Sequence, residues 1–289
     1  MPGGKRQFSE KIPDGLCVAS PVRGVVCWKK TDGGMEMRRL ARAFRKHRWI
    51  AADAALLLGA ALALFVLYQT GIWEPNQPAA GSYAVRGVDV SARQGEVDFA
   101  RLSAQRVRFV FLKATEGAGF RDSRFAQNWD NARKAGLKTG AYLFFRFDVD
   151  AAAQASNFIH AVPAEADALP PVVDLEFYGG YRQHHPARAQ VRPMLDKLLP
   201  ALEARYGKPP ILYCTAETYG AYLEGAYARD PIWIRSVGVP PERPANWTFW
   251  QYSDKGRLDG YRGEERFIDL NVFHGTEQAF EAFAAGQPR

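Results

Sequence analysis

The chain contains 289 residues, of which 47% are hydrophobic and 13% aromatic, enough to bury the core of one large domain or of two small ones. Its formal net charge of +7 comes from residues 1–48, which hold 12 Lys and Arg against 4 Asp and Glu, whereas residues 49–289 hold 26 against 27. Because the remainder of the chain has no basic excess, its composition argues against a nucleic-acid-binding domain.

The N-terminal part predicts a basic tail followed by a membrane-spanning helix. Residues 1–34 carry Gly, Pro and charge without clear periodicity, so we expect residues 1–48 to be a disordered tail on the cytoplasmic side. Residues 49–73 are predicted to form the transmembrane helix. No charged residue occurs from Ala54 to Trp73, and 20 helical residues rise about 30 Å, the thickness of a bilayer's hydrocarbon core.

The charges flanking this apolar stretch predict its orientation. Six Lys and Arg lie between Arg38 and Arg48, and Glu74 follows the stretch, which favours a cytoplasmic N-terminus and an exported remainder. The prediction is a single-pass protein of the cytoplasmic membrane with a periplasmic or otherwise extracytoplasmic domain. A cleaved signal peptide and a buried core helix are the alternatives. The stretch is long for a signal peptide, and the nearest candidate cleavage motif lies at 78–81.

After a polar linker at 74–83, residues 84–289 predict an α/β domain. Apolar runs typical of strands occur at 84–90, 107–113, 138–145, 170–176, 209–214, 231–236, 246–252 and 266–270. Helical patterns occupy 121–135, 151–159, 187–206 and 215–223. The later gaps at 237–245 and 253–265 are short or rich in Pro and Gly. We therefore expect an irregular eight-stranded (β/α) barrel, with five βα units, then three strands, and a closing helix at 276–285.

Four acidic residues follow from this arrangement as candidate catalytic groups. The run at 170–176 ends in Asp174-Leu175-Glu176, and strand alternation turns both acids to the same face. Asp89 ends the first predicted strand and Asp269 ends the eighth, so barrel closure would make them neighbours. Crowded, buried carboxyl groups have raised pKa values, and glycosidic bond cleavage needs one acid with one stabiliser or nucleophile.

The remaining reactive residue types favour structural roles. Cys214 lies in the apolar run ILYC and is expected to be a small buried hydrophobe, because no base is close to it in sequence. His184 and His185 belong to a loop without nearby ligands, and no C-x-x-C or H-E-x-x-H spacing occurs. Lys113 and Glu116 are expected to form an ion pair. We therefore expect no metal and no other cofactor.

The order of short motifs over residues 84–275 resembles that of glycoside hydrolase family 25, the Chalaropsis-type lysozymes or N-acetylmuramidases. The motifs are Gly87-Val88-Asp89-Val90-Ser91 with Gln94-Gly95, FLKATEG at 111–117, Asn128 with Ala135-Gly136-Leu137, GAYLF at 140–144, VDLE at 173–176, Trp250-Gln251-Tyr252 and IDLNVF at 268–273. The family's fold is an irregular barrel of five βα units and three final strands, so the resemblance implies the same fold here.

The resemblance also implies roles for individual residues. Glu176 would be the general acid that protonates the leaving glycosidic oxygen. Asp174 would orient and stabilise the attacking group, which is either the substrate's own N-acetyl group or, alternatively, a carboxylate that attacks directly. Asp89 and Asp269 would set the charge of the site and bind sugar hydroxyls or Asp174. The aromatic residues implied as sugar platforms are Tyr142, Tyr178, Trp250 and Tyr252.

Two positions depart from the family pattern, and they concern substrate preference more than chemistry. Leu143 stands where the family often has His, and Arg235 stands where a small residue is usual. The predicted function is a membrane-anchored peptidoglycan hydrolase that cleaves the β-1,4 bond between N-acetylmuramic acid and N-acetylglucosamine. Its expected partners are peptidoglycan strands and the cytoplasmic membrane. The alternatives are a non-catalytic peptidoglycan-binding barrel acting as a cell-envelope scaffold, and a chitinase-like enzyme on another amino-sugar polymer.

Overall fold

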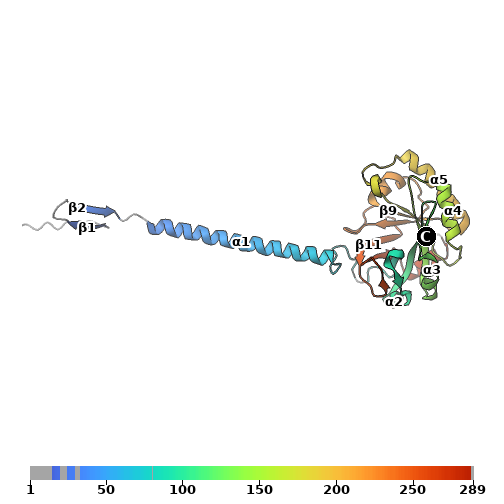
Figure 1. Ribbon diagram of the computed structural model, residues 1–289, viewed down its shortest axis with the longest axis horizontal. Coiled ribbons are helices and arrows are strands. Elements are labelled where there is room, and N and C mark those ends of the chain that lie inside the picture. Colours follow the sequence, from blue (N-terminus) through green and yellow to red (C-terminus); the bar gives the residue numbers. More distant parts are fainter. Residues whose placement is uncertain (1–14, 20–24, 30–32, 80, 288–289) are drawn as a thin grey trace, which may run out of the picture. The chain divides into compact units, whose positions relative to one another are not determined.

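The computed structural model describes residues 15–19, 25–29, 33–79 and 81–287 (Figure 1). The chain divides into two compact units, Met1–Leu64 and Phe65–Arg289. In the first unit, β1 (Gly15–Ala19) and β2 (Val25–Lys29) form an antiparallel pair, which differs from the predicted disorder. The second run, VVCWK, contains two Val and one Trp, which favour strands, and the first, GLCVA, contains one Val. The predicted disorder of residues 1–14, 20–24 and 30–32 lies outside the described residues.

Helix α1 (Gly33–Gln69) contains the predicted membrane span. It begins well before position 49, because the Met, Glu, Leu, Ala and Arg residues that precede the apolar stretch are strong helix formers. Its segment Lys46–Gln69 has 24 residues and contains an 18-residue window with a mean hydropathy of 2.4 and no buried residue, so it is long and apolar enough to cross a membrane. Gly71 terminates the helix with a left-handed φ of 66°, and the amide of Ile72 donates to the carbonyl of Leu67.

The second unit contains a closed barrel of eight strands. These strands are β3 (Arg86–Val90), β5 (Val107–Glu116), β7 (Lys138–Phe144), β8 (Val172–Leu175), β9 (Ile211–Thr215), β10 (Ile232–Arg235), β11 (Phe249–Gly256) and β13 (Ile268–Phe273). They pair in the order β3-β13-β11-β10-β9-β8-β7-β5, and a β3–β5 pairing closes the ring. The prediction of an eight-stranded barrel is confirmed.

Helices follow each of the first five barrel strands, and the last four of them overlap the predicted helical patterns. They are α2 (Phe99–Ala104), α3 (Phe125–Lys134), α4 (Ala151–Ala161), α5 (Arg188–Tyr206) and α6 (Ala216–Thr218), the last continuing into the π-helical turn η3 (Tyr219–Leu223). In Figure 1 the helices α3, α4 and α5 lie on the outside of the strands. The final helix is α7 (Glu277–Ala284). The sequence pattern did not predict α2 or the short strands β4 (Glu96–Val97), β6 (Phe120–Arg121) and β12 (Tyr261–Arg262).

Strand β13 runs antiparallel to both of its neighbours, whereas the other seven barrel strands are mutually parallel. The prediction that Asp269 ends the eighth strand is therefore wrong, because Asp269 lies near the start of β13. The segment between β11 and β13 contains no helix, and a parallel return would need a longer crossover. The reversal still leaves Asp269 at the same end of the barrel as Asp89, its direct partner in the ladder.

Two apolar layers build the core, one inside the barrel and one between strands and helices. Inside the barrel, Phe109 packs edge-on against Phe111 and Phe249 with ring centroids 5.6 and 5.2 Å away. Gly87 and Gly140 make room for these rings, since a Cβ on Gly87 would lie 2.3 Å from the Phe109 ring and one on Gly140 2.6 Å from that of Phe111. The barrel interior below the acids is thus filled by aromatic side chains.

The first residues of the predicted linker at 74–83 are buried against the barrel. Glu74 accepts a hydrogen bond of 2.8 Å from the hydroxyl of Ser253 in β11. Asn76 donates through Nδ2 to the carbonyl of Ser236, directly after β10, over 2.7 Å. Tyr83 packs against Trp250 with ring centroids 6.0 Å apart. The segment therefore lies along the outer surface of β10 and β11.

Candidate active site

The carboxyl end of the parallel strands, called the mouth below, gathers the four predicted acids. Asp89 comes from β3, Asp269 from β13, and Asp174 and Glu176 from the end of β8. Asp89 and Asp269 are direct Cα partners. Asp174 interacts electrostatically with both Glu176 and Asp89, and Glu176 with Asp89. Residues far apart in sequence therefore share one site.

Burial gives the acids of β8 unusual protonation behaviour. Desolvation raises the pKa of Asp174 well above its ordinary value, and the neighbouring Glu176 raises it further. Burial also raises the pKa of Glu176, an effect that the nearby Arg235 guanidinium opposes and Asp89 reinforces. Both carboxyl groups thus hold a proton to higher pH than an exposed acid would, as acid catalysis near neutral pH requires.

Asp89 is the best hydrogen-bonded of the four acids. Its Oδ2 accepts from Gln251 Nε2 over 2.9 Å and from Asn271 Nδ2 over 2.8 Å. Gln251 Nε2 also lies 3.3 Å from Asp269 Oδ2, and the two carboxyl groups share a hydrogen bond. Burial raises the pKa of both acids, and these amide bonds oppose the rise at Asp89. Gln251 and Asn271 fall within the motifs quoted above, yet sequence reasoning assigned them no role. The sequence feature that could have identified Asn271 is its position two residues after Asp269, which places both side chains on the same face of β13.

Asp174 presents a hydrogen-bond acceptor that the protein does not use. Its side chain is 8% exposed, and among the described residues its Oδ1 is buried without a hydrogen-bond partner. A buried carboxyl oxygen left unpaired is costly. Such a group suits a ligand that carries an N–H or O–H donor.

Tyr142 is the predicted aromatic residue that the structure brings together with the acids. It lies in β7, partly exposed, and interacts electrostatically with Asp89, Asp174 and Asp269. Burial raises the pKa of its phenol well above the ordinary value, with the three carboxyl groups adding to the effect. The phenol therefore stays a neutral hydrogen-bond donor at the mouth.

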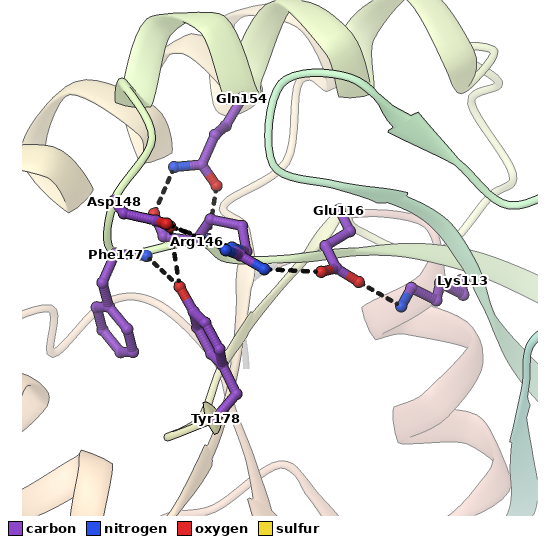
Figure 2. Close-up of polar contacts among 7 residues, drawn as sticks. All are labelled: Lys113, Glu116, Arg146, Phe147, Asp148, Gln154 and Tyr178. Atoms are coloured by element: carbon purple, nitrogen blue, oxygen red, sulfur yellow. Dashed lines mark hydrogen bonds and ion pairs between the residues drawn. The ribbon is translucent and has the colours of Figure 1, made fainter. Parts of the chain in front are cut away.

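Tyr178, two residues after Glu176, is held by the segment that follows β7, and residues 146–148 with Tyr178 are called the rim below (Figure 2). Its hydroxyl accepts from the Phe147 amide over 3.0 Å and donates to Asp148 Oδ1 over 3.2 Å. The Phe147 ring lies nearly parallel to the Tyr178 ring with centroids 5.6 Å apart, and the Arg146 guanidinium lies 4.6 Å from the Tyr178 ring centroid. Phe147 and Arg146 thus cover much of the Tyr178 ring, which was predicted to stack on a sugar.

A chain of charged residues connects this rim to β5 (Figure 2). Arg146 pairs with Asp148 at 3.1 Å and with Glu116 at 3.2 Å, and Glu116 also pairs with Lys113 Nζ at 3.0 Å. The predicted Lys113–Glu116 ion pair is confirmed. Gln154 fixes the backbone of Arg146 by accepting from its amide and donating to its carbonyl, each over 2.9 Å. The network orders the rim without using the four acids.

Trp250 and Tyr252 are not at the mouth, which corrects their prediction as sugar platforms. Side chains alternate along β11, and Gln251 takes the position that faces Asp89, so its two neighbours face outward. Trp250 is 3% and Tyr252 6% exposed. The Trp250 indole donates to the carbonyl of Ser236 over 3.0 Å. Neither ring is open to a sugar.

The two departures from the family pattern have different surroundings. Leu143 is fully buried in the layer between strands and helices, on the opposite face of β7 from Tyr142, so its side chain does not face the mouth. Arg235 ends β10, next to Gln251 in the ladder. Its Nη2 bonds Asp254 Oδ2 at 2.9 Å, and its charge acts on Glu176.

The other reactive residues have structural surroundings. Cys214 in β9 is fully buried, and burial raises the pKa of its thiol, so the prediction of a small buried hydrophobe is confirmed. His185 stacks on Phe177 with centroids 3.8 Å apart and lies 3.3 Å from Glu217. Across the described residues, no group of three or more His, Cys, Asp or Glu is placed to hold a metal ion.

Comparison with known proteins points to one family. Residues 88–261 match the family described as "Glycosyl hydrolases family 25". The chain is 32% identical over 224 residues to Lysozyme M1 of Streptomyces globisporus, covering 71% of this chain and 73% of that protein. It is 35% identical over 214 residues to the uncharacterized protein YegX of Escherichia coli K12, covering 71% and 75%.

Solved structures give the same result for the fold. A family 25 glycosyl hydrolase from Bacillus anthracis superposes with a TM-score of 0.68 at 44% identity, covering 72% of this chain and 97% of that one. A bacterial lysozyme from Streptomyces coelicolor gives a TM-score of 0.62 at 30% identity, covering 71% and 98%.

Proposed function

The chain belongs to glycosyl hydrolase family 25, and on this premise we propose that it is a membrane-anchored muramidase with Glu176 as its general acid. Membership of a family of lysozymes makes the chain a glycosidase that hydrolyses peptidoglycan. The proposed bond is the β-1,4 linkage between N-acetylmuramic acid and N-acetylglucosamine. The observation that supports the assignment best is the convergence of Asp89, Asp174, Glu176 and Asp269 on one mouth, with raised pKa values.

The first step is proton donation by Glu176. Its raised pKa keeps the carboxyl group protonated, and the proton passes to the glycosidic oxygen as the bond from that oxygen to the anomeric carbon breaks. Glu176 is then a carboxylate, which accepts a proton from the water that attacks in the second step. That transfer restores the acid and completes the hydrolysis.

Asp174 is proposed to orient the group that attacks the anomeric carbon. Its unpartnered Oδ1 is a suitable acceptor for the N–H of the substrate's N-acetyl group, whose carbonyl oxygen would then make the attack. Direct attack by a carboxylate is the alternative, and the two differ in whether the intermediate is bonded to the protein. The Asp89–Asp269 pair, which shares one proton, is proposed to supply negative charge opposite the positive charge that develops on the sugar ring.

The proposed anchor is the segment Lys46–Gln69. The basic residues that precede it favour a cytoplasmic N-terminus, which would place the barrel on the side of the membrane where peptidoglycan lies. Alkaline carbonate washing of membranes tests the anchor, and protease added to spheroplasts tests the orientation. A retained anchor predicts that the full chain stays in the membrane pellet and that the barrel is accessible to external protease.

The decisive experiment uses the full-length protein in mild detergent with purified peptidoglycan. Released reducing ends are measured, and products are identified by mass spectrometry after borohydride reduction, which converts an N-acetylmuramic acid reducing end to its alditol. Glu176→Gln should lower the rate about 10²–10⁴-fold, the usual contribution of a general acid. Glu203→Gln is the matched control, because Glu203 pairs with Arg229 on the surface of α5.

Three outcomes would contradict parts of the proposal. Full activity in the Glu176→Gln variant would remove Glu176 from its role. Binding to peptidoglycan without release of reducing ends by the unmodified protein would favour the scaffold alternative. Cleavage of chitin oligosaccharides with intact peptidoglycan would favour a chitinase-like enzyme.

A further inference from the structure

Two buried aromatic side chains, Tyr213 and Trp233, stand behind the amides that contact Asp89. The Tyr213 hydroxyl donates to Gln251 Oε1 over 2.8 Å. The Trp233 indole Nε1 donates to Asn271 Oδ1 over 2.8 Å. All four groups are buried, so these bonds form away from solvent.

The second bond determines which way the Asn271 amide points. An indole nitrogen can only donate, so the Asn271 atom that faces Trp233 must be the oxygen. The NH₂ end of Asn271 is thereby turned toward Asp89 Oδ2, 2.8 Å away. Without that donor, the amide could rotate and present its oxygen to the carboxyl group instead.

The Gln251 amide has the same orientation, with the Tyr213 hydroxyl donating to its oxygen. With its oxygen bonded to the Tyr213 hydroxyl, its NH₂ faces Asp89 Oδ2 at 2.9 Å and Asp269 Oδ2 at 3.3 Å. Asp89 therefore receives two short amide bonds, and Asp269 receives one longer bond. N–H donors stabilise a carboxylate more strongly than a protonated carboxyl group, so the arrangement distinguishes two acids that share a hydrogen bond.

We propose that Tyr213 and Trp233 are positioning residues that make Asp89 the charged member of the Asp89–Asp269 pair and leave the shared proton on Asp269. They act through Gln251 and Asn271 and do not touch the substrate. A fixed negative charge on Asp89 then lies beside Glu176 before the sugar binds. The effect of the charged Asp89 on catalysis rests on the proposed muramidase function. The location of the proton on Asp269 is independent of that function.

The surrounding rings make the two donors rigid. Trp233 stacks on Phe111 with centroids 4.6 Å apart and an interplanar angle of 29°. Tyr213 meets Trp233 edge-on at 4.7 Å. Because Trp233 is fully buried among these rings, neither donor can turn away without disturbing the barrel interior.

The test is a carboxyl ¹³C NMR titration of the full-length protein in detergent micelles, labelled at Asp, with the Asp89 signal assigned by its loss in Asp89→Asn. In Tyr213→Phe, the freed Gln251 amide can present its oxygen to Asp89, so the pKa of Asp89 should rise by about one pH unit, roughly tenfold in proton affinity. Trp233→Phe should raise the pKa of Asp89 in the same direction through Asn271. It is the second variant, should the first fail to fold.

Tyr222→Phe is the matched control, because Tyr222 is equally buried and its hydroxyl donates over 2.8 Å to the carbonyl of Pro186, away from the pair. It removes a buried hydroxyl and should leave the pKa of Asp89 unchanged. An Asp89 pKa in Tyr213→Phe and Trp233→Phe equal to that of the control overturns the proposal. The titration needs no substrate, so its result stands even if peptidoglycan hydrolysis fails. In an active protein, the acidic limb of the kcat/KM profile should move upward with the pKa of Asp89.

Discussion

Replacing Gly87 by Ala should strain the barrel interior directly beneath Asp89. The added Cβ would lie 2.3–2.4 Å from three atoms of the Phe109 ring. That ring cannot easily retreat, since Phe111, Phe249 and Phe280 pack around it with centroids at 5.6, 5.2 and 5.6 Å. Adding a methyl group to a filled core costs about 1–3 kcal/mol. For a domain of this size, this corresponds to a fall in Tm of roughly 2–12 °C.

The same substitution should also lower the rate of peptidoglycan hydrolysis. If β3 moves to relieve the clash, Asp89 moves with it, and a displacement of about 1 Å at this proposed active-site residue can cost about 100-fold in rate. Near-UV circular dichroism of the full chain in detergent would follow Tm, and release of reducing ends would follow activity. Gly220→Ala is the matched control, since a Cβ there meets no atom within 4 Å. Equal Tm and equal activity in the two variants would refute the packing argument.

Two further predictions concern charged residues. Arg235→Gln removes a cation that lowers the pKa of Glu176, so the pKa of Glu176 should rise and the acid should stay protonated to higher pH. The basic limb of the kcat/KM profile should therefore move to higher pH. An unmoved limb would exclude an effect of Arg235 on the protonation of Glu176. Lys208 is 7% exposed and donates to the carbonyls of Ala166, Ala168 and Ala284 over 2.8, 2.6 and 2.5 Å. Lys208→Met should therefore cost about 3 kcal/mol and lower Tm by roughly 6–12 °C in the same thermal scan, with an unchanged Tm as the contrary result.

Much of the barrel could be predicted from local patterns. Apolar runs separated by helical segments predict parallel βα units, and the short Pro- and Gly-rich gaps after residue 236 predict strands without helices. The direction of β13 could not be predicted in this way, because an apolar run has the same composition in either orientation. What determines its direction is the length of the connection from β11, together with the closure of the ring.

The acids of the site were predictable, whereas their supporting residues were not. Asp174 and Glu176 stand out because charge at the end of an apolar strand is expensive without a function. Trp250 and Tyr252 were placed on the wrong face, since β11 is buried on both sides and its sequence does not reveal which residues point inward. Tyr213 and Trp233 resemble ordinary core aromatics in sequence, and only the hydrogen bonds to Gln251 and Asn271 distinguish them.

The burial of Glu74 and Asn76 against β10 and β11 limits how far the barrel can travel. Ten freely jointed residues at 74–83 would allow an end-to-end excursion of roughly 17–19 Å. With its first residues bonded to β10 and β11, this stretch gives the proposed anchored enzyme a shorter free tether, and so fewer glycan strands within reach, than ten free residues would.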